Sequence, residues 1–575
     1  MAFDGFITKS VITELQKTII GAKVNKVYEP TKNDVVLSLY NNGNNYLLEL
    51  CANPELCRIC LTSHTKPNPQ NAYNFCMLLR KYLVGGKITK ISNYDLERTV
   101  EIQFECYNDL NDLVTRKLFV EIMSRQSNII LTNEKNIIID TLKHFDNNVR
   151  ELLPAHQYTF TPITKISFIE TDFNTLVDLK NNSEYTSLTK FFINTFIGFS
   201  KPFIKQAIST LKLPDTEFSN SDLNILYNYL KEIISNFGTT KISCKKLSEK
   251  DYTLVLDKKE LNFDENISEN DILHINYFID EFYYNKEENS IFINSRNNLL
   301  KIVSSSLKKV YKKIENINLK LKECDEMDKF RLYGELLTAN LYKINSGLNY
   351  ENLTVENYYD NNNQITIPLD ISISVQKNIE KYFKKYNKLK NALVIVSKQK
   401  KEAEKELNYI ESIVFCLSNA KTLNDINEVY EEIAENISTK KAISKQEKNK
   451  LNKKNNSNKI ELETTTIDGY TVYIGKNNIQ NDYISLRFSN PNDIWFHTQK
   501  IHGSHVLLRN SENLEIDEIP ENVLFNCAKL AKENSKASSG LNVCVDYCYA
   551  KFVKKVNGAK PGMVIYNNFK TIIVK

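Results

Sequence analysis

The stretch IEKYFKKYNKLKNALVIVSKQKKEAEKELNYIESIVFCL, residues 379–417, decides the architecture of this chain. Its apolar residues alternate at spacings of three and four over five heptads, with one charged interruption at Lys400. A 3.5-residue period keeps one apolar seam facing a partner helix, so the stretch predicts a coiled-coil helix about 58 Å long. The seam consists of Ile379, Tyr382, Tyr386, Leu389, Leu393, Val396, Ala403, Leu407, Ile410, Val414 and Leu417.

A second seam with the same spacing lies upstream and predicts a helix over about 295–325. Its members are Leu300, Val303, Leu307, Val310, Ile314, Ile317, Leu321 and Cys324. An Asn- and Tyr-rich insert, Asn340–Asp370, lies between this helix and the second one, predicted over about 375–418. The two seams can form one antiparallel hairpin, or each helix can dimerise separately. We favour the hairpin because both arms lie in one chain.

The flanking sequence divides into further units, and the whole predicts a multidomain α+β protein. Residues 1–170 and 461–575 each mix short strands with amphipathic helices. Residues 171–240 are helical, 241–435 form the coiled-coil middle, and 436–460 are a Lys/Asn/Ser-rich linker. Such a linker is a solvated spacer or a supplementary hold on nucleic acid.

Composition narrows the function classes. Of 575 residues, 42% are hydrophobic and 25% charged, which excludes wholesale disorder; the net charge is +5. No apolar run approaches the roughly 18 residues that span a bilayer. The start MAFDGFITKS lacks a basic leader before an apolar run, and eleven scattered cysteines are typical of reduced thiols. We therefore expect a cytoplasmic protein without membrane contact.

A helix-hairpin-helix pattern occurs at 196–202, where Gly198 interrupts two apolar helices. A glycine in such a loop can present backbone N–H groups to a phosphate, although many such loops are plain turns. Polar residues at strand ends, Glu97-Arg98, Glu121 and 125–128, indicate either a functional site or structural ion pairs. The Cys57-x-x-Cys60 pair is interpreted as buried small hydrophobes.

The C-terminal unit clusters His497, His502 and His505 around Gly503-Ser504. A zinc site with Cys544 and Cys548 is conceivable, but no second C-x-x-C accompanies it. A nucleophilic Ser504 lacks an elbow motif and an acid partner. We favour a loop whose N–H groups, hydroxyl and flanking imidazoles contact phosphate or ribose, with nearby lysines and aromatic rings gripping RNA. We expect no metal and no cofactor.

Long motifs resemble the NFACT family over essentially the whole chain. They include Phe3-Asp4-Gly5-Phe6, 75–81 with Gly85-Gly86, Glu97-Arg98, 121–129, 475–482, 493–497, 503–506 and 545–566. The resemblance implies an NFACT-N domain (1–170), a helix-hairpin-helix (171–240), a coiled-coil middle domain and an RNA-binding NFACT-R domain (461–575).

The resemblance also implies the residues that act. For tRNA binding and function these are Asp4, Arg80, Glu97, Arg98, Glu121, Arg125 and Asn128. For RNA binding in the C-terminal domain they are Lys476, Asn477, Asn478, His497, Gly503, Ser504, His505, Lys554, Lys555 and Lys560. Three positions depart from common family forms: Glu97 stands where Asp is frequent, Ser124 replaces Gly, and Gln126 replaces His.

What the resemblance implies for function is bacterial ribosome quality control. Such factors bind the large ribosomal subunit obstructed by peptidyl-tRNA, recruit alanyl-tRNA and promote mRNA-independent alanine tailing of the stalled chain. Peptide-bond chemistry stays with the ribosome, so we expect no enzyme. Two rivals remain: a surface fibronectin-binding adhesin, and a formamidopyrimidine-glycosylase-like DNA-binding protein, whose amino-terminal Pro-Glu is replaced here by Ala2-Phe3.

Overall fold

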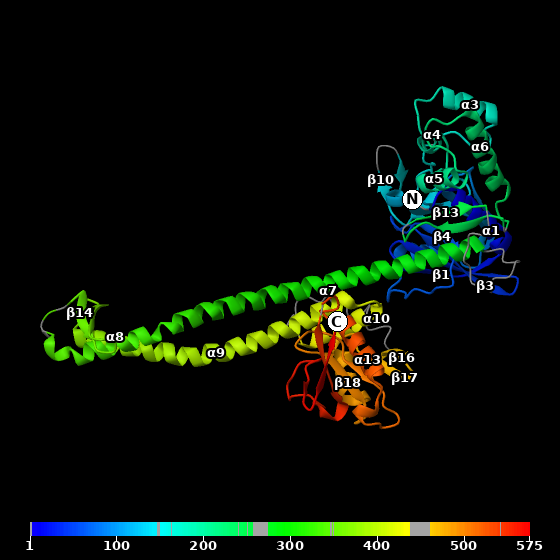
Figure 1. Cartoon of the computed structure of the whole chain (residues 1–575). Helices are drawn as coiled ribbons and strands as arrows, with labels where there is room; N and C mark the ends of the chain where they lie inside the picture. Colours follow the sequence, from blue (N-terminus) through cyan, green and yellow to red (C-terminus); the bar gives the residue numbers. More distant parts are fainter. Residues whose placement is uncertain are drawn as a thin grey trace. The chain divides into compact units, whose positions relative to one another are not determined.

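The computed structural model describes residues 3–146, 150–162, 164–239, 241–249, 251–256, 274–344, 348, 350–436, 460–540 and 542–575. Almost all of the predicted linker 436–460 lies outside this set. The chain forms two compact units, Met1–Asn289 and Ser290–Lys575, each described by itself (Figure 1). Among the described helices, none is both long and apolar enough to cross a membrane.

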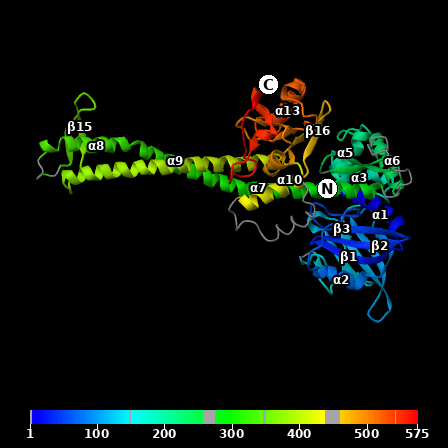
Figure 2. The ribbon, with the colours of Figure 1, turned by 90° about the horizontal axis from the view of Figure 1, so that it is seen from below.

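The first unit is built on an antiparallel sheet of nine strands in the order β4-β3-β2-β1-β5-β6-β7-β8-β9. Helices α1 (Gly5–Ile19) and α2 (Asn74–Leu83) pack on it, and α2 contacts β1 (Figure 2). The strands are β1 (Lys23–Thr31), β2 (Asp34–Asn41), β3 (Asn44–Cys51), β4 (Arg58–Leu61), β5 (Lys87–Asn93), β6 (Thr99–Tyr107), β7 (Leu113–Glu121), β8 (Asn128–Asn133) and β9 (Ile138–Thr141).

The predicted helix-hairpin-helix is confirmed in outline. Helix α4 (Leu188–Thr195) ends before Gly198, whose φ of 84° lies in the left-handed region, and α5 (Lys201–Thr210) follows. Helices α3 (Phe173–Asn181) and α6 (Asn220–Ser235) complete this layer, and β12 (Ser243–Lys246) pairs with β13 (Tyr252–Val255). The core is continuous from the sheet into these helices.

A buried carboxylate holds the start of the longest helix, α7 (His274–Asp325). Glu14 of α1 is fully buried and accepts the backbone N–H groups of Ile275 (3.1 Å) and Asn276 (2.9 Å). These N–H groups have no partner inside the helix, and the helix dipole favours an anion there. The predicted start near 295 was therefore wrong, because the first turns of α7 bury Ile275 and Ile279 in the first unit without a heptad pattern.

The second unit contains the predicted antiparallel hairpin. Helix α9 (Val375–Asn419) runs beside α7, and Tyr311 donates to Glu411 (2.8 Å) while Lys313 donates to Glu406 (2.9 Å). The sequence numbers rise on one arm as they fall on the other, which makes the arms antiparallel. In the sequence, α8 (Met327–Ala339) and the hairpin β14 (Asn352–Asn357)–β15 (Asn363–Pro368) connect α7 to α9, and Figure 1 shows them at the end of the coiled coil. Helix α10 (Leu423–Asn436) follows α9.

The C-terminal domain is a six-stranded sheet in the order β16-β17-β19-β18-β20-β23. Helix α13 (Glu521–Glu533) covers one face, where Val523, Cys527 and Ala531 are buried. The strands are β16 (Glu463–Ile467), β17 (Tyr470–Ile474), β18 (Ile494–Thr498), β19 (Val506–Leu508), β20 (Val543–Tyr549) and β23 (Lys570–Val574).

Two strand predictions in this domain were wrong. The run Tyr483–Arg487 predicts a strand by its sequence, but the segment is helical: α12 (Asn478–Tyr483) continues into a wider turn over Ile484–Phe488, which covers the second face of the sheet. The expected strand 563–575 is two strands, because Ile565–Tyr566 pairs with Val553–Lys554 while Lys570–Val574 pairs with β20.

Candidate functional site

Three motifs that are far apart in the sequence meet at Asp4. Its carboxylate begins α1 by accepting the Ile7 N–H (3.1 Å), and it accepts the Ser200 hydroxyl at 2.5 Å. Ser200 in turn caps α5 of the helix-hairpin-helix. Next to it, Gly5 N–H donates to Gly198 O (2.9 Å). A Cβ on Gly5 would lie 2.0 Å from Leu96 O, so only glycine permits this approach.

Burial dominates the chemistry of Asp4, which is 5% exposed. Desolvation raises the pKa of Asp4 to about 6, although the Ser200 and Ile7 hydrogen bonds and the charge of Arg98 act in the opposite direction. Asp4 therefore holds the loops around it in place and does not present its carboxylate to solvent.

Glu97 and Arg98 stand beside this junction, at the start of β6. Asn93 Nδ2 donates to Glu97 O (3.0 Å), and Ile122 N–H donates to Arg98 O (3.0 Å). Thr99 pairs with Glu121, and Glu121 with Asn128. The structure thus places five predicted residues, or their backbones, at one end of β6–β8: Glu97, Arg98, Glu121, Arg125 and Asn128.

Glu121 is 1% exposed and is fully engaged by protein groups. Arg150 donates to it at 2.7 Å and the Tyr158 hydroxyl at 2.8 Å. Burial, and then the charge of Glu121, raises the pKa of Tyr158. The ion pair between Arg150 and Glu121 holds the segment 150–161 against the sheet. Glu121 therefore stabilises the loops of the candidate site and does not present its carboxylate to a ligand.

The loop after β7 separates buried from exposed residues. Arg125 and Gln126 are exposed, whereas Asn128 is buried, accepts the Lys143 N–H (2.9 Å) and donates to Lys143 O (2.8 Å). Ser124 adopts φ of 52°. Arg125 is therefore the exposed charged side chain in this loop, and it can reach a ligand.

Arg80 does not join this cluster. It lies on α2, is exposed, and donates through Nε to Val27 O (2.9 Å) of β1. Its guanidinium edge faces outward from a different part of the sheet.

In the C-terminal domain, the imidazoles are packed against Trp495. The rings of His497 and His505 lie at 84° with centroids 5.1 Å apart, and the Trp495 and His505 centroids are 5.0 Å apart. Trp495 Nε1 donates to Ser485 Oγ (2.9 Å), which lies 2.7 Å from His505 Nδ1. Burial lowers the pKa of His497 to about 4 and holds that of His505 well below its usual value, so both rings are neutral.

The predicted phosphate loop is occupied by protein contacts. Ser504 N–H donates to Asn534 O (2.9 Å), and a Cβ on Gly503 would lie 2.8 Å from Ser535 Cβ. Gly503 permits a close approach between the loop and the end of α13. The N–H of Ser504 is therefore already used, and RNA contact by this pair stays a prediction.

Three amides of the motif 475–482 form what we call the amide–carboxyl seam with α9 and α10. Asn477 and Gln480 donate to Glu428 at 2.5 and 2.8 Å. Asn478 donates to Glu432 and Ser412, each at 2.9 Å. All three amides are buried, so they dock the domain on the base of the coiled coil.

The two seam carboxyls are unusual acids. Glu432 is fully buried, and desolvation raises its pKa to about 7; burial also raises the pKa of Glu428. Amide donors are the partners that such carboxyls can use in either protonation state. Neither glutamate was singled out from the sequence, because α10 looks like an ordinary amphipathic helix.

The lysines predicted to bind RNA differ in their exposure and in their contacts with other protein groups. Lys554 is exposed, Lys476 lies 3.4 Å from Glu463, and Lys555 pairs with Asp482. Lys560 is exposed and donates to Asn436 Oδ1 (3.3 Å). Of this set, Lys554 and Lys560 present charge to solvent.

Some Glu, Asp, Cys and His side chains lie close enough to one another to be candidate metal ligands. Within the described residues, two groups could hold a cation, Glu49–Cys60–Asp280 and His64–Asp280–Glu281, and neither includes a C-terminal histidine. In the first, Glu49 already accepts Arg58 and Lys66, each at 2.7 Å. Cys57 and Cys60 are buried free thiols, as the sequence indicated.

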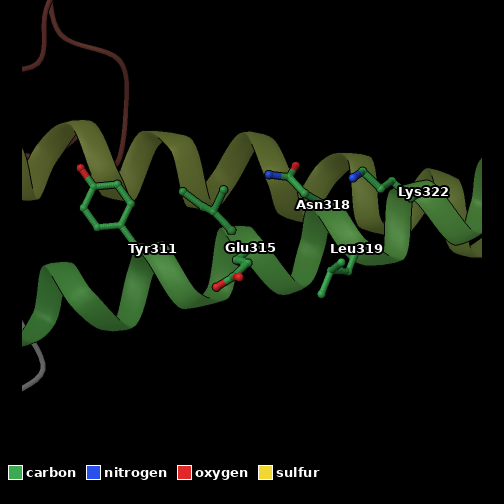
Figure 3. Close-up of a pocket in the computed structure, with 6 residues that line it drawn as sticks. Tyr311, Glu315, Asn318, Leu319 and Lys322 are labelled. Atoms are coloured by element: carbon green, nitrogen blue, oxygen red, sulfur yellow. The ribbon is translucent and has the colours of Figure 1, made fainter.

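Surface hollows lie away from these residues. An open groove of about 400 Å³ runs along α7, and Figure 3 shows side chains that line it. One of them, Tyr311, donates its hydroxyl to Glu411 of α9. A second hollow of about 340 Å³ lies beside α5, lined by Lys201, Pro202, Lys205, Gln206, Leu247, Ser248 and Asp251. Lys201 and Lys205 of this second hollow are exposed on α5.

The fold defines a class of multidomain protein in which an α+β amino-terminal domain and a C-terminal α+β domain flank a coiled-coil hairpin. The model for NFACT N-terminal and middle domains matches residues 4–454, and that for the NFACT protein RNA binding domain matches 462–568. The chain belongs to the NFACT family.

The relatives extend this match to full length. The chain is 35% identical over 586 residues to Rqc2 homolog RqcH of Bacillus subtilis, covering 100% of this chain and 98% of that protein. Coiled-coil domain-containing protein 25 of Mus musculus is 35% identical over 104 residues, 18% of this chain and 50% of that protein. A solved structure of the C-terminal part of the fibronectin/fibrinogen-binding protein of Streptococcus suis covers 49% of this chain and 94% of that chain, with 27% identity and a TM-score of 0.37.

Proposed function

We propose that this chain acts in ribosome quality control in the cytoplasm. It binds the large ribosomal subunit obstructed by peptidyl-tRNA, recruits alanyl-tRNA, and promotes mRNA-independent alanine tailing of the stalled chain. The observation that carries the proposal is the full-length similarity to the Rqc2 homolog RqcH, together with an RNA-binding domain.

The amino-terminal junction supplies the tRNA contacts in this proposal. Buried Asp4 and Glu121 fix the loops, while Arg98 and Arg125 carry the charge that meets phosphate. Arginine suits this task because its planar fork binds phosphate oxygens in pairs. The chain itself supplies positioning, and the peptide bond is formed by the ribosome.

The proposal is tested by purifying the tagged protein at low salt and sequencing its bound RNA. We expect large-subunit rRNA with one enriched tRNA and little small-subunit rRNA. Equal amounts of both subunits, or no tRNA, would contradict the proposal.

A paired variant then tests the site. Glu97→Ala with Arg98→Ala should abolish tail addition while thermal unfolding stays close to that of the wild type. The matched control is Glu101→Ala with Lys117→Ala, farther along the same sheet. Normal tailing by the first variant would remove the role assigned to the pair.

A further inference from the structure

Four exposed lysines share one face of the first unit's sheet: Lys23 and Lys26 of β1, and Lys87 and Lys90 of β5. Lys23 lies directly opposite Lys87 in the antiparallel pair. Along β2, Lys23 and Lys26 pair with Tyr40 and Ser38, two residues apart and so on one face. We call these four residues the lysine track.

Two matched irregularities create the track. β1 has a register shift between Val24 and Lys26, and β5 has one between Ile88 and Lys90. In a regular strand, residues three apart point to opposite faces. One extra residue in each strand, Asn25 and Thr89, turns the second lysine to the same face as the first. Bulges that re-aim side chains are features of functional sites.

The arrangement works against stability. Like charges directly opposite each other destabilise a strand pair. Among the described residues, none of the four lysines lies within 4.0 Å of a carboxylate oxygen. The exposed Glu105, which pairs with Lys87 from β6, is the neighbouring acid on this face. The row thus carries four cations against one directly opposed acid, and this excess of positive charge favours the binding of an anion.

The geometry selects a linear anion. Because β1 and β5 are antiparallel about the Lys23–Lys87 pair, Lys26 and Lys90 lie at opposite ends of the row. Between its two lysines each bulged strand advances by only two partner residues, so at about 3.3 Å per residue the row extends over about 13 Å. Tyr40, 46% exposed, lies beside Lys23 and offers a ring for stacking. A point anion would use only one position.

We propose that the lysine track binds the phosphate backbone of RNA, as a contact surface separate from the Asp4 junction and from the C-terminal domain. The inference rests on the proposed function, since it takes RNA as the partner. Phosphate neutralisation supplies affinity without sequence selectivity, so the track holds an RNA whose identity is read elsewhere.

The test compares full-length variants in binding fluorescent oligouridylate across a salt series. The variant K23Q/K26Q/K87Q/K90Q should bind at least about tenfold more weakly at low salt, and its salt slope should fall by about 3, since each single-strand phosphate contact contributes about 0.7. The control K301Q/K308Q/K309Q/K312Q removes the same charge from exposed positions of α7. Equal weakening by both variants would contradict RNA binding by the lysine track, since the effect would then come from the net charge of the protein.

Two single variants sharpen the test. Glu105→Gln removes the neighbouring acid and should tighten RNA binding about twofold or more. Lys23→Gln should weaken RNA binding and yet raise the melting temperature, since it relieves the repulsion with Lys87 and leaves the Lys87–Glu105 pair in place. A merely structural lysine would lower the melting temperature on removal, which would contradict the proposal.

The outcomes separate the track from the function. Wild-type binding with an unaffected quadruple variant rejects the track alone. No oligouridylate binding by the wild type, and no large-subunit rRNA in the low-salt purification, rejects the proposed function. Loss of binding to phosphatidylserine vesicles without loss of RNA binding would assign the track to a lipid surface and overturn the RNA proposal.

Discussion

At the scale of single residues, the buried Asp4 joins the start of α1 to the start of α5 through its carboxylate. Its two carboxylate oxygens are used by Ile7 and Ser200, and its pKa is raised to about 6. The ordinary value is 3.8, so the folded state resists ionisation relative to the unfolded state. Ionised Asp4 therefore lowers the free energy of unfolding, while its hydrogen bonds hold the loops in a fixed geometry.

This sets a pH prediction for Asp4→Asn. A raised folded pKa destabilises the fold progressively as pH rises from about 3.8 to about 6, and the cost is constant above that. The asparagine keeps the N-cap acceptor and carries no charge. We expect the variant to gain at most about 3 kcal/mol over the wild type above pH 6, with no difference below pH 4.

Thermal melting across pH measures this difference, with Asp172→Asn as the control. Asp172 also caps a helix, but its pKa is lowered by its hydrogen bond to Thr175, so that substitution should destabilise at neutral pH. A pH-independent difference at Asp4 would contradict the assigned burial effect.

Ser124 occupies a backbone conformation that favours glycine. Its φ of 52° costs an L-residue about 1 kcal/mol. Ser124→Gly should therefore raise the free energy of unfolding by up to about 1 kcal/mol, measured by urea denaturation. Ser127→Gly is the matched control, because Ser127 has φ of −59° and its hydroxyl accepts the Met123 N–H (2.8 Å). That control should destabilise.

At the scale of elements, the amide–carboxyl seam decides where the RNA-binding domain sits on the coiled-coil base. Asn478→Asp would set a second buried carboxyl against Glu432, at a cost of about 3 kcal/mol or more. We expect faster hydrogen exchange in α10 and α12, with exchange in α13 unchanged. Asn526→Asp on α13, outside the seam, is the control.

The seam also carries a pH dependence. Because the pKa of Glu432 is raised to about 7 from 4.5, docking weakens as pH rises between those values and is constant above them. Asn478 and Tyr409 face this carboxyl and ease its charge, as does Lys555, whereas Asp482 opposes it. In Glu432→Gln, the protection factors of the α10 amides, which correct for the intrinsic pH dependence of exchange, should lose the fall that the titration of Glu432 causes. A wild type without pH dependence would contradict the buried-acid assignment.

At the scale of the whole molecule, the proposed function assigns positioning to the amino-terminal domain and anchoring to the C-terminal domain. The amino-terminal junction orients loops around Arg98, while the C-terminal domain is joined to the coiled coil by the seam. Removing residues 461–575 should weaken sedimentation with the large subunit, because the cations of Lys554 and Lys560 are lost with the domain. Asn478→Asp, which keeps those cations but undocks them, should have a smaller effect. Unchanged sedimentation of the truncated chain would refute an anchoring role.

Local pattern was sufficient for much of the architecture. Residue 375 begins α9, as the heptads indicated, and β4, β17 and β20 match their predicted bounds. The family motifs also identified the membership that the comparisons confirm. These successes share one cause: a helix or strand that buries one face carries its own period in the sequence.

Strand β5 was missed for the opposite reason. Its bulge at Thr89 breaks the alternation of the segment 87–93, so no strand period is visible. The same bulge turns Lys90 toward Lys87 and builds the lysine track. The irregularity that hid the strand is thus the feature that gives it a proposed function.

The sequence by itself determined the heptad-bearing parts of the coiled-coil arms, most strands, and the polar side chains that are candidates for a site, since each follows from local spacing and residue type. Only the tertiary structure decided which of those side chains face inward. Asp4 meets Ser200 across 196 positions, and Asn478 meets Glu432 across 46. Burial and pairing depend on partners distant in the chain, and no local period records them.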